Sequence, residues 1–240
     1  MSLLDEVLVA NGGLPRWHEV ETIKIHQLLG GELWKIKGVD GIIDDSVVEI
    51  RLKEEHAWHR PLPRPGLRSS FTPNLVVIET DDDTAQVVES LPAPRASFDG
   101  HTLTTPWSML QLAYFAGYAM WTYLSEPFSF TLPGVRTEEL GVWHEDGETW
   151  RRLAVRYPAN IATHSAEQVL YVDTDGLLRR RDYAVDISEG FLGAHYMHGH
   201  QEFDGLVLPT ERVVYARSED NQPLRDQVAI TIDVHEVTII

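Results

Sequence analysis

The residues from Thr102 to Ser125 contain no charged side chain, although Asp, Glu, Lys and Arg make up 24% of the sequence. A helix that is apolar on every side has to be buried on every side. Thr105 can cap such a helix, Pro106 fits its first position, and Pro127 follows its end. These signals predict a buried helix from Trp107 to Leu124. Its aromatic residues are Trp107, Tyr114, Phe115, Tyr118, Trp121 and Tyr123.

Two faces of this helix differ in bulk when its residues are placed at the helical spacing. One face carries large side chains, and most of its rings have polar tips. The other face offers much less bulk, so we expect it to press against a sheet while the rings form the wall of a ligand cavity. The bulky stripe comprises Trp107, Leu110, Tyr114, Tyr118 and Trp121, and the other face comprises Ala113, Gly117, Met120 and Leu124.

A transmembrane span is the alternative for a charge-free segment of this length. The segment contains Gln111, Gly117 and several Ser, Thr and Tyr residues, and neither of its flanks carries Lys or Arg. Spanning helices are usually more apolar and are anchored by such basic residues. We therefore expect a buried helix and no membrane span.

The composition excludes several classes of function. With 37 acidic and 20 basic residues, the formal net charge is -17, which disfavours nucleic acid and anionic membrane surfaces as partners. The absence of cysteine excludes disulfides, thiolate nucleophiles and cysteine-based metal sites. No nucleotide-binding loop or serine-hydrolase elbow occurs, so we expect no cofactor. The first residues lack the pattern of a secretory signal, which predicts a cytoplasmic location. The oligomeric state remains open.

Short segments with β-strand patterns, separated by turn residues, fill most of the remaining chain. The clearest is a hairpin around residues 173–176, and three more strands follow it without a helical pattern between them. Such spacing indicates an antiparallel meander. A short helix opens the chain, and a proline-rich loop or edge covers residues 59–71. Strands are predicted over residues 22–29, 32–37, 46–53, 75–79, 84–88, 137–142, 150–157, 168–172, 177–185, 195–203, 207–215 and 228–240.

The predicted fold is mainly β, of the α+β kind. A curved antiparallel half-barrel wraps around the apolar helix, and the N-terminal helix closes one end. A linker near Pro92 and Pro94 makes a domain boundary conceivable. The helix that follows it would then lack enough sheet to cover it. We therefore predict a single domain over residues 1–240.

This order of elements is accompanied by several short strings of residues. Together they resemble a group of soluble bacterial proteins of undescribed function that share the fold of the outer-membrane lipoprotein carrier, LolA. The resemblance implies an unclosed, strongly curved sheet that holds acyl chains or other apolar ligands in its hollow. Because the chain lacks an export signal and a lipobox cysteine, the resemblance implies the fold and not the trafficking role. The strings are Ala10-Asn11-Gly12-Gly13-Leu14, Phe71-Thr72-Pro73, Ala113-Tyr114-Phe115, Asp175-Gly176-Leu177-Leu178-Arg179-Arg180 and Leu208-Pro209-Thr210.

Several ionisable residues on neighbouring predicted strands are candidates for acid–base chemistry. His195 or His164 can serve as a general base if Asp182 orients the imidazole, with Tyr183 nearby. A satisfied buried polar network is the favoured alternative. The strand register decides between them, because a single bulge exchanges the sides on which Asp182 and Tyr183 lie.

A metal site is the remaining possibility for the histidine-rich segment. On a strand, His198, His200 and Glu202 point to one face and can supply three ligands to zinc or iron. The spacing alone is common and no further metal-binding motif supports it. We therefore predict no metal and regard these residues as weak candidates.

Two functions fit the sequence. The first is binding of a small hydrophobic or amphipathic molecule in the hollow, with Trp107, Tyr114, Tyr118, Trp121 and Tyr196 as the contact surface. The second is a cofactor-free cavity enzyme that performs acid–base chemistry, such as a cyclisation, isomerisation or hydrolysis, on a similar molecule. An imidazole beside Asp182 in the cavity would favour the enzyme.

Overall fold

Thirteen strands form one antiparallel sheet in the computed structural model, which describes residues 1–240. The strand order is β6-β5-β4-β3-β2-β1-β13-β12-β11-β10-β9-β8-β7, so the sheet is unclosed and ends at β6 and β7. The bounds are β1 Thr22–Gly30, β2 Asp45–Arg51, β3 His56–Arg60, β4 Leu67–Thr72, β5 Leu75–Thr80, β6 Val87–Pro92, β7 Arg136–Glu145, β8 Glu148–Arg156, β9 Glu167–Val172, β10 Leu178–Val185, β11 Phe191–Phe203, β12 Leu206–Arg217 and β13 Pro223–Ile239.

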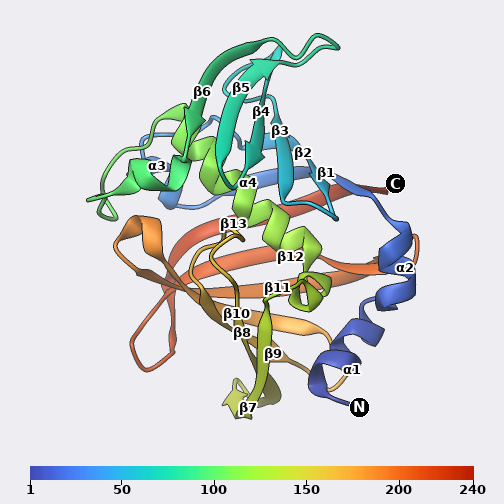
Figure 1. Ribbon diagram of the computed structural model, residues 1–240. Helices are drawn as coiled ribbons and strands as arrows, with labels where there is room; N and C mark the ends of the chain where they lie inside the picture. The colour runs from blue at the N-terminus through green and yellow to red at the C-terminus, as the bar shows by residue number, and fades with distance from the viewer.

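The first and last strands join the two halves of the sheet. Ile23 of β1 pairs with Ile239 of β13, and the pairing continues to Gly30 and Thr231 with one bulge. The N-terminal strands β1–β6 and the C-terminal strands β7–β13 therefore share a continuous ladder of hydrogen bonds. In Figure 1 the curved sheet wraps around helix α4, with β2–β6 above the helix and β7–β12 below it. This confirms the predicted curved, unclosed antiparallel sheet around an apolar helix.

Helix α4, Met109–Ser125, is buried on all sides, as predicted. It begins later than expected, however. Ser108 is the N-cap: its hydroxyl accepts a hydrogen bond from the backbone of Gln111, and the Gln111 side chain accepts one from the backbone of Ser108. This reciprocal capping box outweighs the predicted start at Thr105 and Pro106, because it satisfies two backbone donors at once. The helix packs mainly against β3 and β4.

Gly117 lies where α4 approaches the sheet most closely. A Cβ atom at this position would lie 2.3 Å from Cγ of Phe71 on β4. Only a residue without a side chain permits this contact. The prediction that the Gly117 side of the helix packs against the sheet is confirmed.

The other helices are short and lie between or beside the strands. Residues 32–37 were predicted as a strand, but α3 occupies this segment, because Leu33 and Trp34 both turn into the core and the Trp34 indole N–H donates to the Gly30 carbonyl. The remaining helical segments are α1 Leu3–Ala10, α2 Gly13–Glu19, α3 Leu33–Ile36, η1 Pro94–Phe98, η2 Phe128–Thr131 and η3 Asp186–Ser188.

Two further predictions are corrected: the loop or edge over residues 59–71 and the strand over residues 84–88. The prolines between residues 59 and 71 occupy only the turn between β3 and β4, so both flanking segments remain paired strands. Strand β6 begins at Val87 because Asp82 accepts backbone hydrogen bonds from Thr84 and Ala85, which extends the preceding turn. Asp residues commonly stabilise turns in this way.

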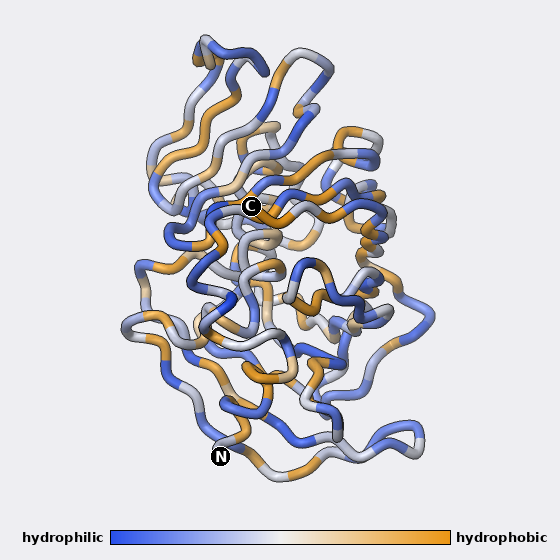
Figure 2. Tube along the Cα trace, turned by 90° about the vertical axis from the view of Figure 1, so that its right-hand side faces the viewer, coloured by the Kyte–Doolittle hydropathy of each residue, from blue (hydrophilic) through white to orange (hydrophobic).

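Two groups of buried apolar residues form the core. The larger comprises 41 residues around α4, and the smaller comprises 10 residues contributed by α1, η2, strands β8–β11 and Tyr157 directly after β8. Hydrophobic and hydrophilic stretches alternate along the trace in Figure 2, as expected when one face of each strand is buried. No helix of the protein is long and apolar enough to cross a membrane.

Candidate ligand-binding cavity

Three neighbouring cavities lie between the surface and α4, and together we call them the inner cavity. Its mouth is a cleft of 280 Å³ between α3 and β11, lined by Ile36, Leu103 and Phe191 among others. Behind the mouth lies a void of 10 Å³, which shares Leu103 and Phe191 with it. A second void of 20 Å³ shares Phe115 with the first. The inner cavity thus consists of one cleft at the surface and two small, mainly apolar voids between α4 and the sheet.

The second void is walled by small and flexible apolar side chains. Ala116, Ala119 and Met120 of α4 face Ile230 and Ile232 of β13 across it. Methionine has three rotatable bonds and repacks easily, and Ala leaves room for a larger neighbour. This wall can therefore widen at little cost if an apolar ligand enters.

A cluster of hydrogen-bonded polar side chains around His164 lies in the wall of the first void. His164 and Tyr183 line this void, with their rings stacked and the centroids 4.2 Å apart. The Tyr123 hydroxyl lies 2.8 Å from Nε2 of His164 and 3.0 Å from the Tyr183 hydroxyl, and the Tyr118 hydroxyl lies 3.3 Å from Nδ1. Both imidazole nitrogens thus have phenol partners.

The surroundings of His164 keep its imidazole neutral. Burial and then the guanidinium groups of Arg181 and Arg95 lower the pKa of His164 well below its ordinary value. A neutral imidazole with phenol partners can exchange hydrogen bonds with a polar ligand group. A group with so low a pKa is a weak base, however, which counts against its predicted catalytic role.

Two buried arginines share one carboxylate at the end of α4. Arg181 of β10 and Arg212 of β12 donate to the two oxygens of Glu126, at 3.1 Å and 3.2 Å. Arg212 also donates to the Tyr123 carbonyl in the last turn of the helix, at 2.8 Å. Glu126 follows α4 directly, where the helix dipole disfavours a negative charge. The arginines offset this cost and fix the helix end to the C-terminal half of the sheet.

His195, the other proposed base, is also buried beside these arginines. Its Nε2 atom lies 3.4 Å from Arg212, and its Nδ1 atom is buried without a partner. Burial, followed by Arg212 and Arg181, lowers the pKa of His195 well below its ordinary value. The imidazole therefore stays neutral within the polar network.

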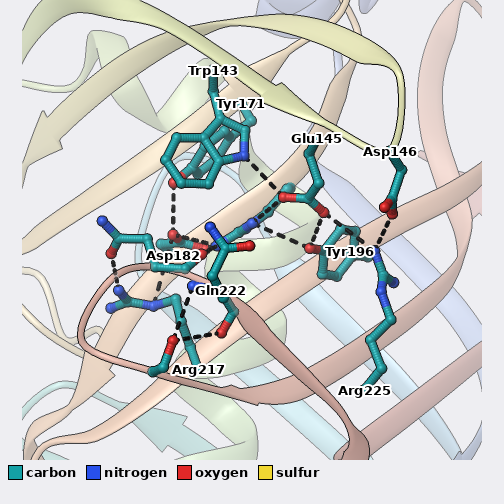
Figure 3. Close-up of polar contacts among 12 residues, drawn as sticks. Trp143, Glu145, Asp146, Tyr171, Asp182, Tyr196, Arg217, Gln222 and Arg225 are labelled. Atoms are coloured by element: carbon teal, nitrogen blue, oxygen red, sulfur yellow. Dashed lines mark hydrogen bonds and ion pairs between the residues drawn. The ribbon is translucent and has the colours of Figure 1, made fainter.

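Asp182 lies on the opposite face of the sheet from both imidazoles. Its carboxylate accepts two hydrogen bonds from Arg180, at 2.7 Å and 2.8 Å, and one from the Tyr171 hydroxyl at 2.7 Å (Figure 3). The predicted pairing of Asp182 with His195 or His164 is therefore not formed. The cause is the register of β10, which turns Tyr183 towards α4 and Asp182 away from it.

Tyr196 belongs to this outer network and not to the inner cavity. Its hydroxyl donates to Glu145, which also accepts from Arg180 and, at 2.9 Å, from the Trp143 indole N–H (Figure 3). These contacts hold the tip of the β7–β8 hairpin against β10 and β11. A contact of Tyr196 with a ligand in the inner cavity would have to cross the sheet.

The aromatic stripe predicted as the contact surface is buried but lies beside the two voids and does not line them. Trp121 donates its indole N–H to the carbonyls of Arg51 and Glu54, at 2.8 Å and 3.0 Å. Trp107 packs against Phe115, and Tyr118 reaches the void only through His164. Tyr114 lines a separate surface cavity of 500 Å³ near η1.

The weak metal candidates do not come together. No group of three or more His, Asp or Glu side chains is arranged to hold a metal ion. Nδ1 of His200 lies 3.3 Å from the Arg179 guanidinium, and burial together with Arg179 lowers its pKa to about 4. A neighbouring guanidinium opposes the binding of a cation at this position.

Glu55 carries an unusual carboxyl group near the 500 Å³ cavity. One oxygen accepts a hydrogen bond from the backbone of Ala162, which lines that cavity, and the other is buried without a partner. Burial raises the pKa of Glu55 to about 8. The group is therefore protonated in the folded protein at neutral pH.

We expect the Glu55→Gln variant to become more stable relative to the native protein as the pH rises from about 4.5 to about 8. In this window the unfolded chain has released the proton and the folded chain retains it, so native stability falls with rising pH. Gln keeps an oxygen that accepts the hydrogen bond from the Ala162 backbone, and its side chain does not titrate. Urea unfolding at several pH values measures the difference. Glu54→Gln, at an exposed neighbour, is the control and should show no such trend; equal trends would refute the account.

Comparisons with known proteins bear on the fold of this chain. No protein-family model matches the chain, and no curated protein matches it in sequence. Solved structures, by contrast, do match the chain. A LolA superfamily protein from Nitrosomonas europaea superposes with a TM-score of 0.53 at 10% identity, over 99% of this chain and 92% of that one. This chain has a LolA-like fold.

Two other solved structures share the LolA-like fold. A DUF1329 family protein from Desulfovibrio piger gives a TM-score of 0.54 at 12% identity, over 99% of this chain and 91% of that one. A domain from Vibrio parahaemolyticus, named as a candidate outer-membrane lipoprotein-sorting protein, gives 0.54 at 8% identity, over 99% and 90%. At these identities the likeness concerns the fold alone.

Sequence reasoning missed the groups that form the mouth of the inner cavity. Leu103 and Phe191 lie far apart in the sequence, and no local pattern brings them together. It also missed Glu126 and Arg212, because a lone acid after a helix and a lone arginine on a strand look like surface residues. The only available signal was that Glu126 directly follows a segment without any charged residue.

Proposed function

We propose that this protein binds a small hydrophobic or amphipathic molecule between α4 and the inner face of the sheet. The observation that carries the proposal is the inner cavity, a cleft at Phe191 and two small apolar voids behind it that share lining residues and reach the wall at Ala119. Ligand sites are typically concave and mainly apolar, with a few polar groups that orient the ligand. The His164 group supplies such polar atoms in the wall.

The structural neighbours add support of a general kind. The name of the Vibrio parahaemolyticus domain refers to lipoprotein sorting, and lipoproteins carry acyl chains. The chain shares the fold in which such a molecule would be held. The acid–base enzyme has no comparable support, because Asp182 lies across the sheet from both candidate bases.

A fluorescence titration with 1-aminoanthracene, an apolar probe, tests the proposal. We expect its emission to rise on binding and the Phe191→Asp variant to bind it about tenfold or more weakly, because a charge at the mouth replaces apolar contact area. Val142→Asp is the matched control. Val142 is an exposed residue on the edge strand β7, 55% accessible, and lies outside the inner cavity.

Equal weakening by both variants would show that the added charge acts non-specifically, and unchanged binding in Phe191→Asp would exclude the mouth as the route. Circular dichroism of each variant before the titration separates loss of binding from loss of folding.

A further inference from the structure

A second concave site lies on the outer face of the sheet, which is turned away from α4. It is a cavity of 760 Å³ across β7–β10, and we call it the outer groove. Its floor consists of Ala154, Val169 and Ala184, which lie on three adjacent strands and point outward. Side chains this small leave the groove open above the sheet. The volume falls in the range typical of pockets for small molecules.

The rim of the outer groove carries basic residues that lack acidic partners. Arg136 and Arg152 line it, and neither forms an ion pair, although acidic residues outnumber basic ones by 37 to 20. Arg152 donates only to the Gly141 carbonyl, at 2.8 Å. Arg136 stands directly opposite Arg156 on the neighbouring strand. Like charges in that position repel each other, so an anion between them would relieve the repulsion.

The outer groove is lined by four arginines and three acidic residues, so its lining carries a small excess of positive charge. Glu138, opposite Ala154 on the neighbouring strand, forms no ion pair. Glu167 lies 3.6 Å from Arg156, on the exposed side of the strands. Asp182 already accepts hydrogen bonds from Arg180 and Tyr171, and Arg217 lies 3.7 Å from it. Figure 3 shows Asp182 held between Tyr171 and Arg217. Its negative charge is compensated within the outer network. The charges of the lining without an ion pair are therefore Arg136, Arg152 and Glu138, which leaves a net positive charge.

The walls of the outer groove are also fixed in place. Arg180 packs its guanidinium 4.7 Å from the Tyr171 ring centroid and donates to the Asn221 carbonyl at 2.6 Å. Asn221 lines the groove and in turn accepts a hydrogen bond from Arg217. A preformed wall lowers the ordering cost that a ligand has to overcome.

We propose that the outer groove binds a small molecule with an acidic group, a carboxylate or a phosphate, and an apolar body. Either Arg136 or Arg152 holds the acidic group, since one guanidinium group recognises a carboxylate or a phosphate by paired hydrogen bonds. The apolar body covers the floor formed by Ala154, Val169 and Ala184. This site is separate from the inner cavity, because the sheet lies between them.

The test uses three probes that share one ring system: 1-naphthoate, 1-naphthyl phosphate and the neutral 1-naphthamide. Each is titrated into the full chain while methyl NMR signals are followed. We expect the two acids to shift the methyl signals of Ala154, Val169 and Ala184, and naphthamide to bind about tenfold or more weakly. The Ala119 methyl, in the inner cavity, should not move in the same concentration range.

The double variant Arg136→Gln with Arg152→Gln should lose the preference for the acids over naphthamide. Arg64→Gln is the control, because Arg64 is exposed and lies in the β3–β4 turn, outside the outer groove. Tighter binding of naphthyl phosphate than of naphthoate would support the proposal and identify a phosphate as the preferred group; equal binding of the two acids would also support it.

Other results would overturn the proposal. Equal affinity for naphthoate and naphthamide would show that the rim does not recognise the acid. An absence of shifts at the floor methyl groups, with or without binding elsewhere, would show that the outer groove is not the site. A retained preference for acids in the double variant would contradict the roles of Arg136 and Arg152.

Discussion

Replacing Glu126 with Gln is expected to lower the free energy of unfolding by about 3–5 kcal/mol, the usual cost of removing one partner from a buried ion pair. Arg181 and Arg212 are both almost fully inaccessible, and they share this carboxylate. Without it, two guanidinium charges remain buried with no counter-charge. Gln retains the size and one acceptor oxygen, so the loss reports mainly on charge.

Chemical denaturation monitored by circular dichroism measures this loss. Glu54→Gln is the control, since the ion pair of Glu54 with Arg51 is more than half exposed on both sides and should contribute no more than about 1 kcal/mol. A loss for Glu126→Gln as small as that of the control would mean that water or a rearranged side chain compensates the arginines. The assignment of Glu126 as the fixing point of α4 would then be wrong.

Replacing Gly117 with Ala should destabilise the fold by about 1–3 kcal/mol, as expected when a methyl group is forced into a filled core. The direction of the change in stability is informative, because replacing Gly with Ala in an exposed helix stabilises that helix by about 0.8–1 kcal/mol. The added Cβ would lie 2.3 Å from Cγ and 2.5 Å from Cβ of Phe71, so either the helix or β4 has to move.

Gly141→Ala is the matched control for the Gly117 variant. An added Cβ at Gly141 meets only the end of the Arg152 side chain, at 3.8 Å, and its stability should change little. Thermal unfolding of both variants measures the two changes in stability. A Gly117→Ala variant as stable as the native protein would show that α4 does not press against Phe71 in solution.

The buried helix and the meander were predictable because their signals are local. A segment without charges has to be buried along its whole length, wherever the rest of the chain lies. Asp173 accepts backbone hydrogen bonds from Asp175 and Leu177, so the hairpin between β9 and β10 follows from its own turn residues.

The site was less predictable because it depends on register and on long-range contacts. A bulge between Leu178 and Arg180 in the pairing of β10 with β9 sets which residues face α4. No sequence pattern announces that bulge, and it determines whether Asp182 or Tyr183 reaches the inner cavity. The face of α4 that lines the voids depends on long-range packing as well. The aromatic stripe was assigned to the ligand, whereas Phe115 and Ala119 of the same helix line the second void.

An apolar ligand held between α4 and β13 can be located directly. In the complex with 1-aminoanthracene, nuclear Overhauser contacts should connect the probe to the methyl groups of Ala119, Ile230 and Ile232. These three side chains surround the second void from both sides. Contacts to these groups are the predicted result. Contacts confined to exposed residues, or to the outer face of the sheet, would contradict it.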